Sequence, residues 1–486
     1  MKNDFGRRLM QIFEKYEVWL LAMPPILIAV VKYALFSMGL MYEDNIVQKG
    51  LSFSIYGAYF CLAVLMCLYY RKAGKMRIRN IAITAAAVLA LLAVGFAKSG
   101  GRGDVLKIVG DYVVFCIPAL IIGGNIASTG RELKFFEGIE RLNIVMFPAA
   151  CGYFLMAVTN TNPFMNYNYL GIMNYFMVGW ALLPFLCCTI LRFVNQDEFY
   201  IGSKTLTAKT AKLVRIVLML VYMFDIFASG TRGAIIAVPF FLLISMAVYI
   251  IHKRKVWQLA GMLVVYVGIY LGGVFIYTPP GFYAIGRMDI VTEGLADGKL
   301  VTSNHFVQDE EASPSSGPKG SGTAGGSMAG GSAAGGAPAA SGPKAPRDDK
   351  GLMNAAQKEI VTDRGELYRL ALAEFRENWL TGLGPAGYYS KYNNTPHNIL
   401  LELLCELGVL GVVVIAGIAF LALKMLFRIK DNFTYAIFMC MSTVCFINLM
   451  VSGSIWSSSD FYLWLGYVMT YLAAPKCADS STVAVK

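Results

Sequence analysis

Long apolar runs recur along almost the whole chain, and this pattern constrains the fold more than any other feature. A helix that crosses a membrane needs about 20 consecutive, mainly apolar residues. Hydrophobic residues make up 57% of the 486 residues and charged residues only 15%, whereas charged residues make up about 25% of an average soluble domain. The sequence therefore predicts an all-α, polytopic membrane protein.

We predict about twelve transmembrane helices from the lengths of these runs. The ends of the third and fourth are blurred, because Ala-rich and Gly-rich stretches flank them. The predicted spans are 18–40, 51–70, 80–97, 105–123, 143–160, 169–191, 213–229, 234–251, 257–277, 399–424, 433–451 and 459–475.

Basic residues gather in every second short loop between the predicted spans, as in the segments 71–79, 131–141, 192–215, 253–255 and 424–430. The other short loops hold only Lys49, Lys98, Arg102 and Arg232. Because cytoplasmic loops carry the excess of Lys and Arg, this bias predicts that both termini are cytoplasmic and that the loop 278–398 is extracytoplasmic. The same bias accounts for the net charge of +11 without nucleic acid as a partner.

The chain divides into three parts on this reading. Residues 1–277 hold spans one to nine, residues 278–398 form one large extracytoplasmic loop between spans nine and ten, and residues 399–486 hold the last three spans and a cytoplasmic tail. Within the loop, residues 312–346 are rich in Gly, Ser, Ala and Pro. Such a tract buries too little apolar surface to offset the entropy lost on ordering, so we predict that it is disordered.

The end of the large loop carries a predicted helix of about 16 residues. Asp363 and Glu366 have the spacing of a capping box, and Gly382, Gly384 and Pro385 end the helical pattern. The helix has an apolar stripe and a polar face, which predicts a position on the outer membrane surface or over a cavity. The stripe consists of Tyr368, Leu372, Phe375 and Trp379.

Arg364 is the first residue of this predicted helix, where a cation opposes the helix dipole. An anion bound at the same place would reverse that penalty, because the free N–H groups of the first turn would point at it. Gly365 would allow a close approach. The alternative is a solvated arginine near a helix start.

A second predicted helix start contains His397. Thr395 is a candidate N-cap, Pro396 suits the first helical position, and His397 and Asn398 complete the first turn. A helix N-terminus favours neutral imidazole, which can accept a proton. His252 lies in a cytoplasmic loop and His305 borders the Gly/Ser tract, so His397 is the candidate base. The alternative is an ordinary surface histidine.

Further polar residues lie at or inside the predicted spans. Arg232 lies in a tight outer turn, Ser229–Gly233, where it is either an interfacial anchor or a bidentate phosphate ligand. Asp225, Glu402 and Glu406 lie within predicted spans. Intramembrane carboxylates are candidates for function, but hydrogen bonding between helices explains many of them.

The segment from Arg364 to Gly411 resembles the signature region of the O-antigen ligase/polymerase family. The shared pattern is an arginine that opens a helix, a Gly-x-Gly, a His-Asn pair and a Glu-x-Gly-x-x-Gly. The turn at 229–233 and the plan of twelve spans with one large outer loop resemble the family as well. The matching positions are Arg364, Gly382, Gly384, His397, Asn398, Glu406, Gly408 and Gly411.

The resemblance implies a glycosyltransferase of the bacterial cytoplasmic (inner) membrane. It would move a glycan from undecaprenyl diphosphate to an acceptor hydroxyl on the outer face. Arg232 and Arg364 would hold the diphosphate, and His397 would activate or orient the acceptor. The outer side has no Asp-x-Asp pair, so we expect no metal or other cofactor and an inverting displacement in which arginines stabilise the leaving group. The supporting candidates are Gly365, Asn398, Glu402 and Glu406.

Three activities share these motifs: ligation of O-antigen to a lipid A core, polymerisation of repeat units, and transfer of glycan to protein. A different class is a transporter or flippase for the same lipid-linked sugars. Such transporters show repeated halves and broken helices at the midplane. The sequence shows no evident repeat, and its polar residues gather at the outer edge, so we favour a transferase.

Overall fold

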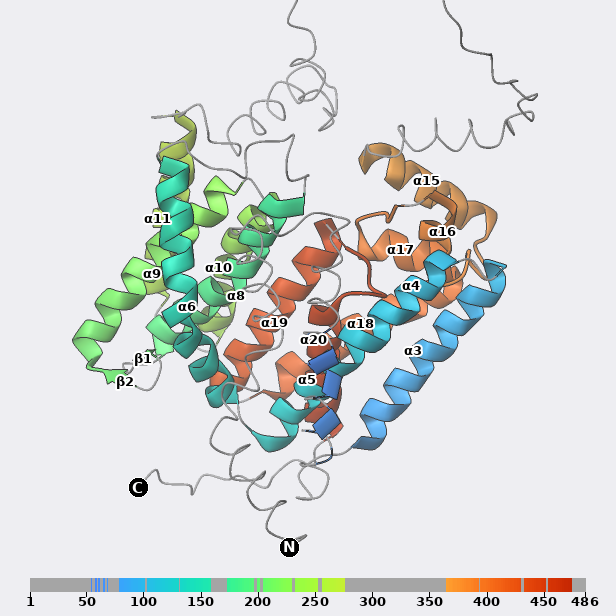
Figure 1. The fold of residues 1–486 in the computed structure, drawn as a ribbon, viewed down its shortest axis with the longest axis horizontal. Helices are drawn as coiled ribbons and strands as arrows, with labels where there is room; N and C mark the ends of the chain where they lie inside the picture. The colour runs from blue at the N-terminus through green and yellow to red at the C-terminus, as the bar shows by residue number, and fades with distance from the viewer. Residues whose placement is uncertain are drawn as a thin grey trace, which may run out of the picture.

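The computed structural model shows a bundle of long helices with a group of shorter helices at one end (Figure 1). Apart from isolated positions between 54 and 68, it describes twelve segments of the chain. They are 78–100, 103–130, 132–158, 173–195, 199–201, 204–229, 232–251, 256–275, 364–392, 394–429, 432–451 and 453–473.

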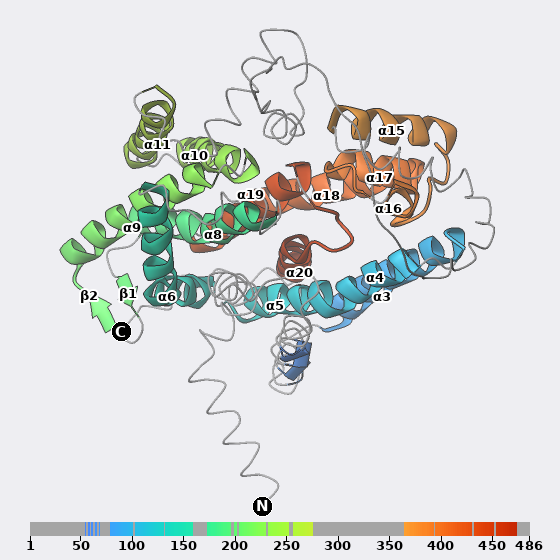
Figure 2. The ribbon, with the colours of Figure 1, turned by 45° about the horizontal axis from the view of Figure 1, so that its top comes forward.

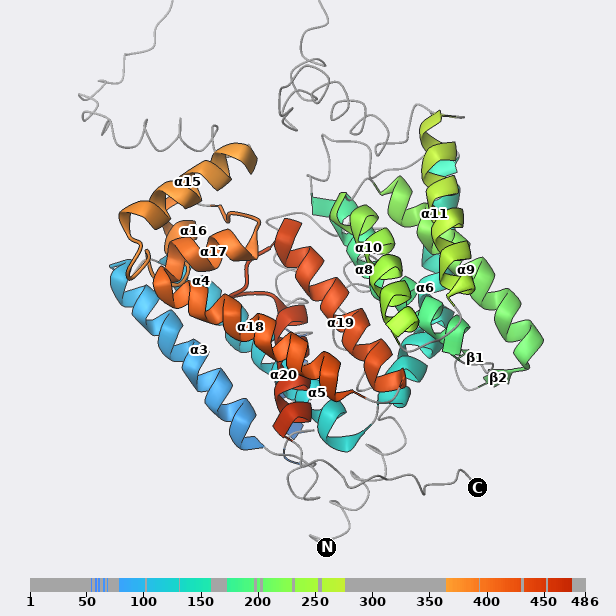
Figure 3. The ribbon, with the colours of Figure 1, turned by 180° about the vertical axis from the view of Figure 1, so that it is seen from behind.

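The long helices run in alternating directions and form the bundle (Figures 1 and 3). In chain order they are α3 (Ile78–Lys98), the continuous run of α4 (Gly103–Asp111), the π-helical η1 (Tyr112–Cys116) and α5 (Ile117–Thr129), then α6 (Glu132–Val158), α8 (Met173–Asn195), α9 (Ala208–Ala228), α10 (Arg232–Ile251), α11 (Trp257–Phe275), α18 (Val409–Arg428), α19 (Asn432–Val451) and α20 (Ser459–Ala473).

Three shorter helices cover one end of the bundle: α15 (Arg364–Glu377), α16 (Gly387–Tyr392) and α17 (Ile399–Leu407). A small antiparallel hairpin of β1 (Phe199–Ile201) and β2 (Lys204–Leu206) lies at the opposite end (Figure 1). The predicted all-α class is therefore confirmed, apart from this hairpin.

Four helices in the described part of the chain are long and apolar enough to cross a membrane: Arg79–Lys98, Val105–Ser128, Gly233–Ile250 and Val409–Arg428. Shorter apolar helices lie at Gly179–Asn195, Trp257–Gly272 and Phe438–Met450. These features fit a membrane protein, while the count of twelve spans stays a prediction. The spans at 18–40 and 51–70 and the tract at 312–346 lie wholly or mostly outside the described residues.

The prediction of one continuous tenth span at 399–424 was wrong. The chain forms α17 and then α18, with Gly408 between them at a positive φ of 59°. Glu402 and Glu406 therefore belong to a short helix that precedes the span Val409–Arg428.

Glycines allow α5 and α20 to pack in close contact (Figure 2). A Cβ atom added at Gly466 would lie only 2.1 Å from the carbonyl oxygen of Leu120, and one added at Gly123 would lie 2.0 Å from that of Leu463. Small residues permit this kind of backbone approach between membrane helices. These contacts thus pack α20, near the C-terminal end of the described chain, against α5.

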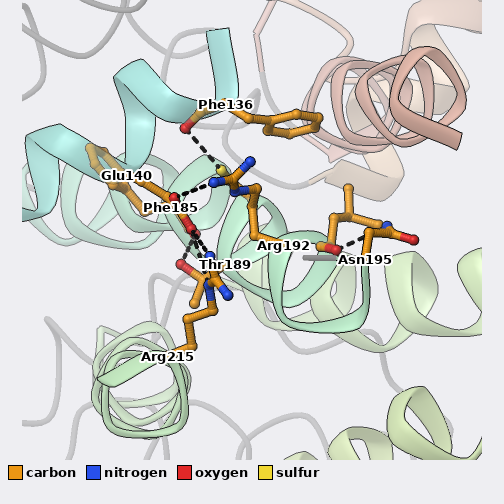
Figure 4. A network of polar contacts seen from close by, with 9 residues as sticks. Phe136, Glu140, Phe185, Thr189, Arg192, Asn195 and Arg215 are labelled. Carbon is orange, nitrogen blue, oxygen red and sulfur yellow. Dashed lines mark hydrogen bonds and ion pairs between the residues drawn. The ribbon is translucent and has the colours of Figure 1, made fainter. Parts of the chain in front are cut away.

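A buried ion cluster connects three helices of the bundle (Figure 4). The Glu140 carboxylate on α6 accepts a hydrogen bond from Arg192 Nη2 on α8 at 2.8 Å, and from Arg215 Nη2 and Nε on α9 at 2.7 and 3.1 Å. Each of the three residues is at most 1% exposed. Buried charges persist only when they are paired, so the Glu140 carboxylate offsets part of the cost of burying both arginines.

We predict that Glu140→Gln destabilises the protein strongly, because two buried guanidinium groups would then face a neutral amide. Breaking such a buried cluster costs about 3–5 kcal/mol. Thermal unfolding of the purified protein in detergent should show a clearly lower midpoint. Glu366→Gln is the matched control, since Glu366 pairs with the exposed Arg369, and it should change the midpoint little. Equal midpoints for the two variants would contradict the assigned role of Glu140.

Candidate functional site

Arg364 is the first residue of α15, as predicted, and its side chain is partly buried. The capping-box partner Asp363 lies outside the described residues. Glu366 instead accepts hydrogen bonds from Arg369 Nη2 and Nε, at 2.6 and 2.8 Å. This pair neutralises Arg369, and Arg364 stands separately at the helix N-terminus.

The buried face of α15 differs from the predicted apolar stripe. Leu367, Ala371 and Glu374 are buried, whereas Leu372 and Trp379 are 42% and 57% exposed. Leu367 and Ala371 pack in a small cluster with Tyr388 and Cys405. The stripe at positions 372 and 379 therefore faces away from the protein core.

Two glycine turns lock the end of α15 to the end of α17. Val409 N–H donates to the Trp379 carbonyl at 2.8 Å, and Gly384 N–H donates to the Glu406 carbonyl at 2.8 Å. Both Gly382 and Gly408 have φ 59°, a conformation that disfavours residues with a Cβ atom. An added Cβ at Gly382 would lie 2.2 Å from the Glu406 carbonyl oxygen. The two glycines are therefore required by backbone contact between the turns.

Lys98 supports the same turn, a role that sequence reasoning missed. Its ammonium group, at the end of α3, donates to the carbonyl oxygens of Thr381 and Gly382, each at 3.2 Å. The early span thus caps a turn that lies almost 300 residues later in the chain. The sequence signal that could have indicated this role is that Lys98 is one of few basic residues in the predicted outer loops.

The carboxylate of Glu406 joins three segments. It accepts hydrogen bonds from the N–H groups of Ala386 and Tyr388, at 2.8 and 3.1 Å, and from the indole N–H of Trp456. Burial raises the pKa of Glu406, and these N–H donors oppose that shift. With three hydrogen bonds to separate segments, the Glu406 carboxylate holds the turn before α16 and the segment before α20 against α17.

Glu402 makes the second such connection. It accepts hydrogen bonds from the Ser454 hydroxyl and from Ile455 N–H, the latter at 3.0 Å. Burial raises its pKa to about 7, while the bonds from Ser454 and Ile455 act in the opposite direction. One turn apart on α17, Glu402 and Glu406 fasten this helix to the segment that precedes α20.

His397 is not in the first turn of a helix, contrary to the prediction. Asn398 is the N-cap of α17, and its side chain accepts hydrogen bonds from the N–H groups of Leu400 and Leu401 at 3.0 and 3.2 Å. The cap thus replaces the predicted Thr395, whose hydroxyl instead lies 3.2 Å from His397 Nδ1. His397 precedes the cap with φ 51°, a left-handed conformation that is uncommon for residues other than glycine.

Arg364 and His397 lie close enough to interact. Burial, and to a smaller extent the positive charge of Arg364, lower the pKa of His397 to about 4. The neutral imidazole predicted for this position is thus favoured, but by burial and a neighbouring cation in place of a helix dipole. A cation beside a neutral base is an arrangement that can bind an anion and accept a proton.

Side chains of α16 form hydrogen bonds to α15. The carboxylate of Glu374 accepts hydrogen bonds from Lys391 Nζ and the Tyr392 hydroxyl, and the Tyr388 hydroxyl donates to the Leu367 carbonyl at 2.9 Å. Burial raises the pKa of Tyr388 and of Tyr392, so both stay protonated donors. These contacts attach α16 to α15, and no motif in the sequence had indicated them.

The other predicted residues lie at the start of α10 and the end of α9. Arg232 is the first residue of α10, but its side chain lies outside the described part of the structure, so its meeting with Arg364 stays a prediction. Asp225 is fully buried near the end of α9, and its carboxylate oxygens have no hydrogen-bond partner among the described residues. Ser229 donates to the Ile226 carbonyl at 2.7 Å.

Within the described segments, no group of three or more His, Cys, Asp or Glu side chains is placed to hold a metal ion.

Comparison with known proteins gives one match. Residues 216–416 match the family model described as O-Antigen ligase. A search of curated proteins and a search of solved structures each found no match. The matched region begins in α9, ends in α18 and includes Arg232, Arg364 and His397. Together with the arginine, glycine and His-Asn pattern, this match identifies an O-antigen ligase domain at residues 216–416 and supports membership of the O-antigen ligase/polymerase family.

Proposed function

We propose that the protein is a membrane glycosyltransferase that moves a glycan from undecaprenyl diphosphate to an acceptor hydroxyl on the outer face of the bacterial cytoplasmic membrane. The acceptor would be a lipid A core, a growing polysaccharide or another glycan. In this proposal the chain has twelve spans with both termini in the cytoplasm. Membership of the O-antigen ligase/polymerase family supports the reaction class.

The observation that carries the proposal is that Arg364 and His397 both lie in the matched region, near enough for the charge of Arg364 to lower the pKa of His397. Arg364 opens α15 and presents a cation together with the free N–H groups of the first turn. His397 has an imidazole whose pKa is lowered to about 4 by burial and by Arg364. The site therefore combines an anion-binding group and a neutral base at the end of the bundle that lies opposite the basic β1–β2 region (Figure 1).

The proposed step is a single displacement at the anomeric carbon. The acceptor oxygen forms a bond to this carbon while the bond from the carbon to the diphosphate oxygen breaks, and the electron pair leaves with the diphosphate. Thr395 lies at His397 Nδ1, so Nε2 is the nitrogen that would accept the hydroxyl proton. Arg364, joined by Arg232, would stabilise the charge on the leaving group without a metal, and the product would have inverted configuration.

Glu402, Glu406 and Asn398 have supporting roles in this proposal. Asn398 caps α17, and the two carboxylates hold α17 against its neighbours. They would position His397 without contact with the substrate. Gly365 is exposed in the first turn of α15, where it leaves room for a phosphate oxygen.

We predict that His397→Ala reduces transfer by about 10²–10⁴-fold, the usual contribution of a positioned base. The assay would follow glycan transfer by the purified protein in lipid nanodiscs, and binding of the lipid-linked donor would be measured separately and should persist. His305→Ala is the control, since His305 borders the Gly/Ser tract, and it should keep normal transfer. Near-normal transfer by His397→Ala would rule out this residue as the base.

The pH dependence of kcat/KM tests the same residue independently. Because the imidazole must be neutral to accept a proton and its pKa is lowered to about 4, transfer should stay constant from pH 8 to about pH 5 and fall below that. Arg364→Gln removes a cation that lowers this pKa, so the acid limb should move to higher pH. Arg369→Gln changes an exposed arginine of the same helix and should leave the limb in place. A wild-type limb near pH 6.5 would contradict the assignment.

A further inference from the structure

The end of α15 carries exposed apolar side chains that no other described segment covers. Leu372, Trp379 and Leu380 are 42%, 57% and 61% exposed. Leu372 and Trp379 are seven residues apart, so they share one side of a helical path. The exposed arginines Arg369 and Arg376 lie beside them on the same side. A surface with Trp and Leu next to Arg is typical of a helix that lies in a membrane interface.

The apolar end of α15 adjoins the start of a candidate membrane span. Trp379 accepts a hydrogen bond from Val409 N–H at 2.8 Å, and Val409 is the first residue of the span Val409–Arg428. The sides of this span are largely exposed, beginning with Val409 and Leu410. In a membrane protein such sides face lipid. The apolar end of α15 is therefore continuous with a lipid-facing surface at the point where the span begins.

We propose that Leu372, Trp379 and Leu380 insert into the outer interface of the lipid bilayer, with Arg376 among the phospholipid headgroups. Tryptophan is enriched at this level of the membrane because its ring is amphipathic. Exposed arginine side chains extend toward phosphate while their stems stay in the apolar layer. The occupant of this surface is thus lipid.

This attachment would set the height of α15 above the membrane. The axis from Arg364 to Glu377 is about 20 Å long for 14 residues, with lipid contact at its C-terminal end. Figures 1 and 3 show α15 lying across the end of the bundle, next to α17. The position of α15 in the membrane interface does not depend on the proposed transfer reaction.

The test uses the fluorescence of Trp379 in the full-length protein reconstituted in phospholipid vesicles. The chain has six tryptophans, so the signal of Trp379 is the difference between the wild-type protein and Trp379→Phe. Lipids brominated near the headgroup end of their acyl chains should remove most of this difference signal. Lipids brominated near the chain end should remove less, and aqueous iodide should remove little. A difference signal quenched by iodide but not by brominated lipid would overturn the proposal, and one quenched by neither would show that protein covers Trp379.

A second measurement keeps the test valid if Trp379→Phe fails to fold. A photoreactive benzoylphenylalanine at Leu372 should yield adducts with the mass of one phospholipid. The same probe at Glu377, which is exposed and lies five residues further along α15 on a different side of the helix, is the matched control and should yield few. Equal lipid adducts at both positions, or adducts between two copies of the chain at Leu372, would contradict the lipid contact.

Discussion

The carboxylate of Glu406 organises the end of the molecule that is covered by α15, α16 and α17. It accepts hydrogen bonds from the backbone N–H of Ala386 in the turn after α15, from the backbone N–H of Tyr388 in α16, and from the indole N–H of Trp456 in the segment before α20. Buried donors and a buried acceptor satisfy one another, so removing this group would leave several polar atoms unpaired. Arg364 and His397 keep their relative position because α15 and α17 are joined through these contacts and through the two glycine turns.

The sequence predicted the parts of the site whose signals are local. The start of α15 at Arg364 follows from a helical pattern with a polar N-terminus, whereas the helix ends at Glu377, before the glycines and proline that were expected to end it. The all-α membrane class follows from repeated apolar runs. The same local rules placed His397 near a helix start, but both Thr395 and Asn398 are good caps. The structure uses Asn398, while the Thr395 hydroxyl contacts the His397 ring.

The features that were missed depend on distant segments. The residues from 399 to 424 form one apolar run. Nothing within that run reveals that position 408 must be glycine, because the Trp379 carbonyl oxygen lies 2.5 Å from where its Cβ would be. Likewise, the support of Lys98 for the turn at Gly382 joins the first spans to the matched family region. The Glu140, Arg192 and Arg215 cluster was also outside the reach of the sequence, since each residue alone resembles a loop charge near a span end.

The central claim is that this outer end transfers glycan between substrates instead of moving a lipid-linked glycan across the membrane. The most direct measurement is to supply a purified undecaprenyl-diphosphate-linked glycan and an acceptor to the protein in nanodiscs, where both faces are accessible, and to quantify free undecaprenyl diphosphate. The account predicts that this lipid is released in equal amount to the glycosylated acceptor. Intact donor that is unchanged in nanodiscs, but crosses from one leaflet to the other in sealed vesicles that contain the protein, would contradict it.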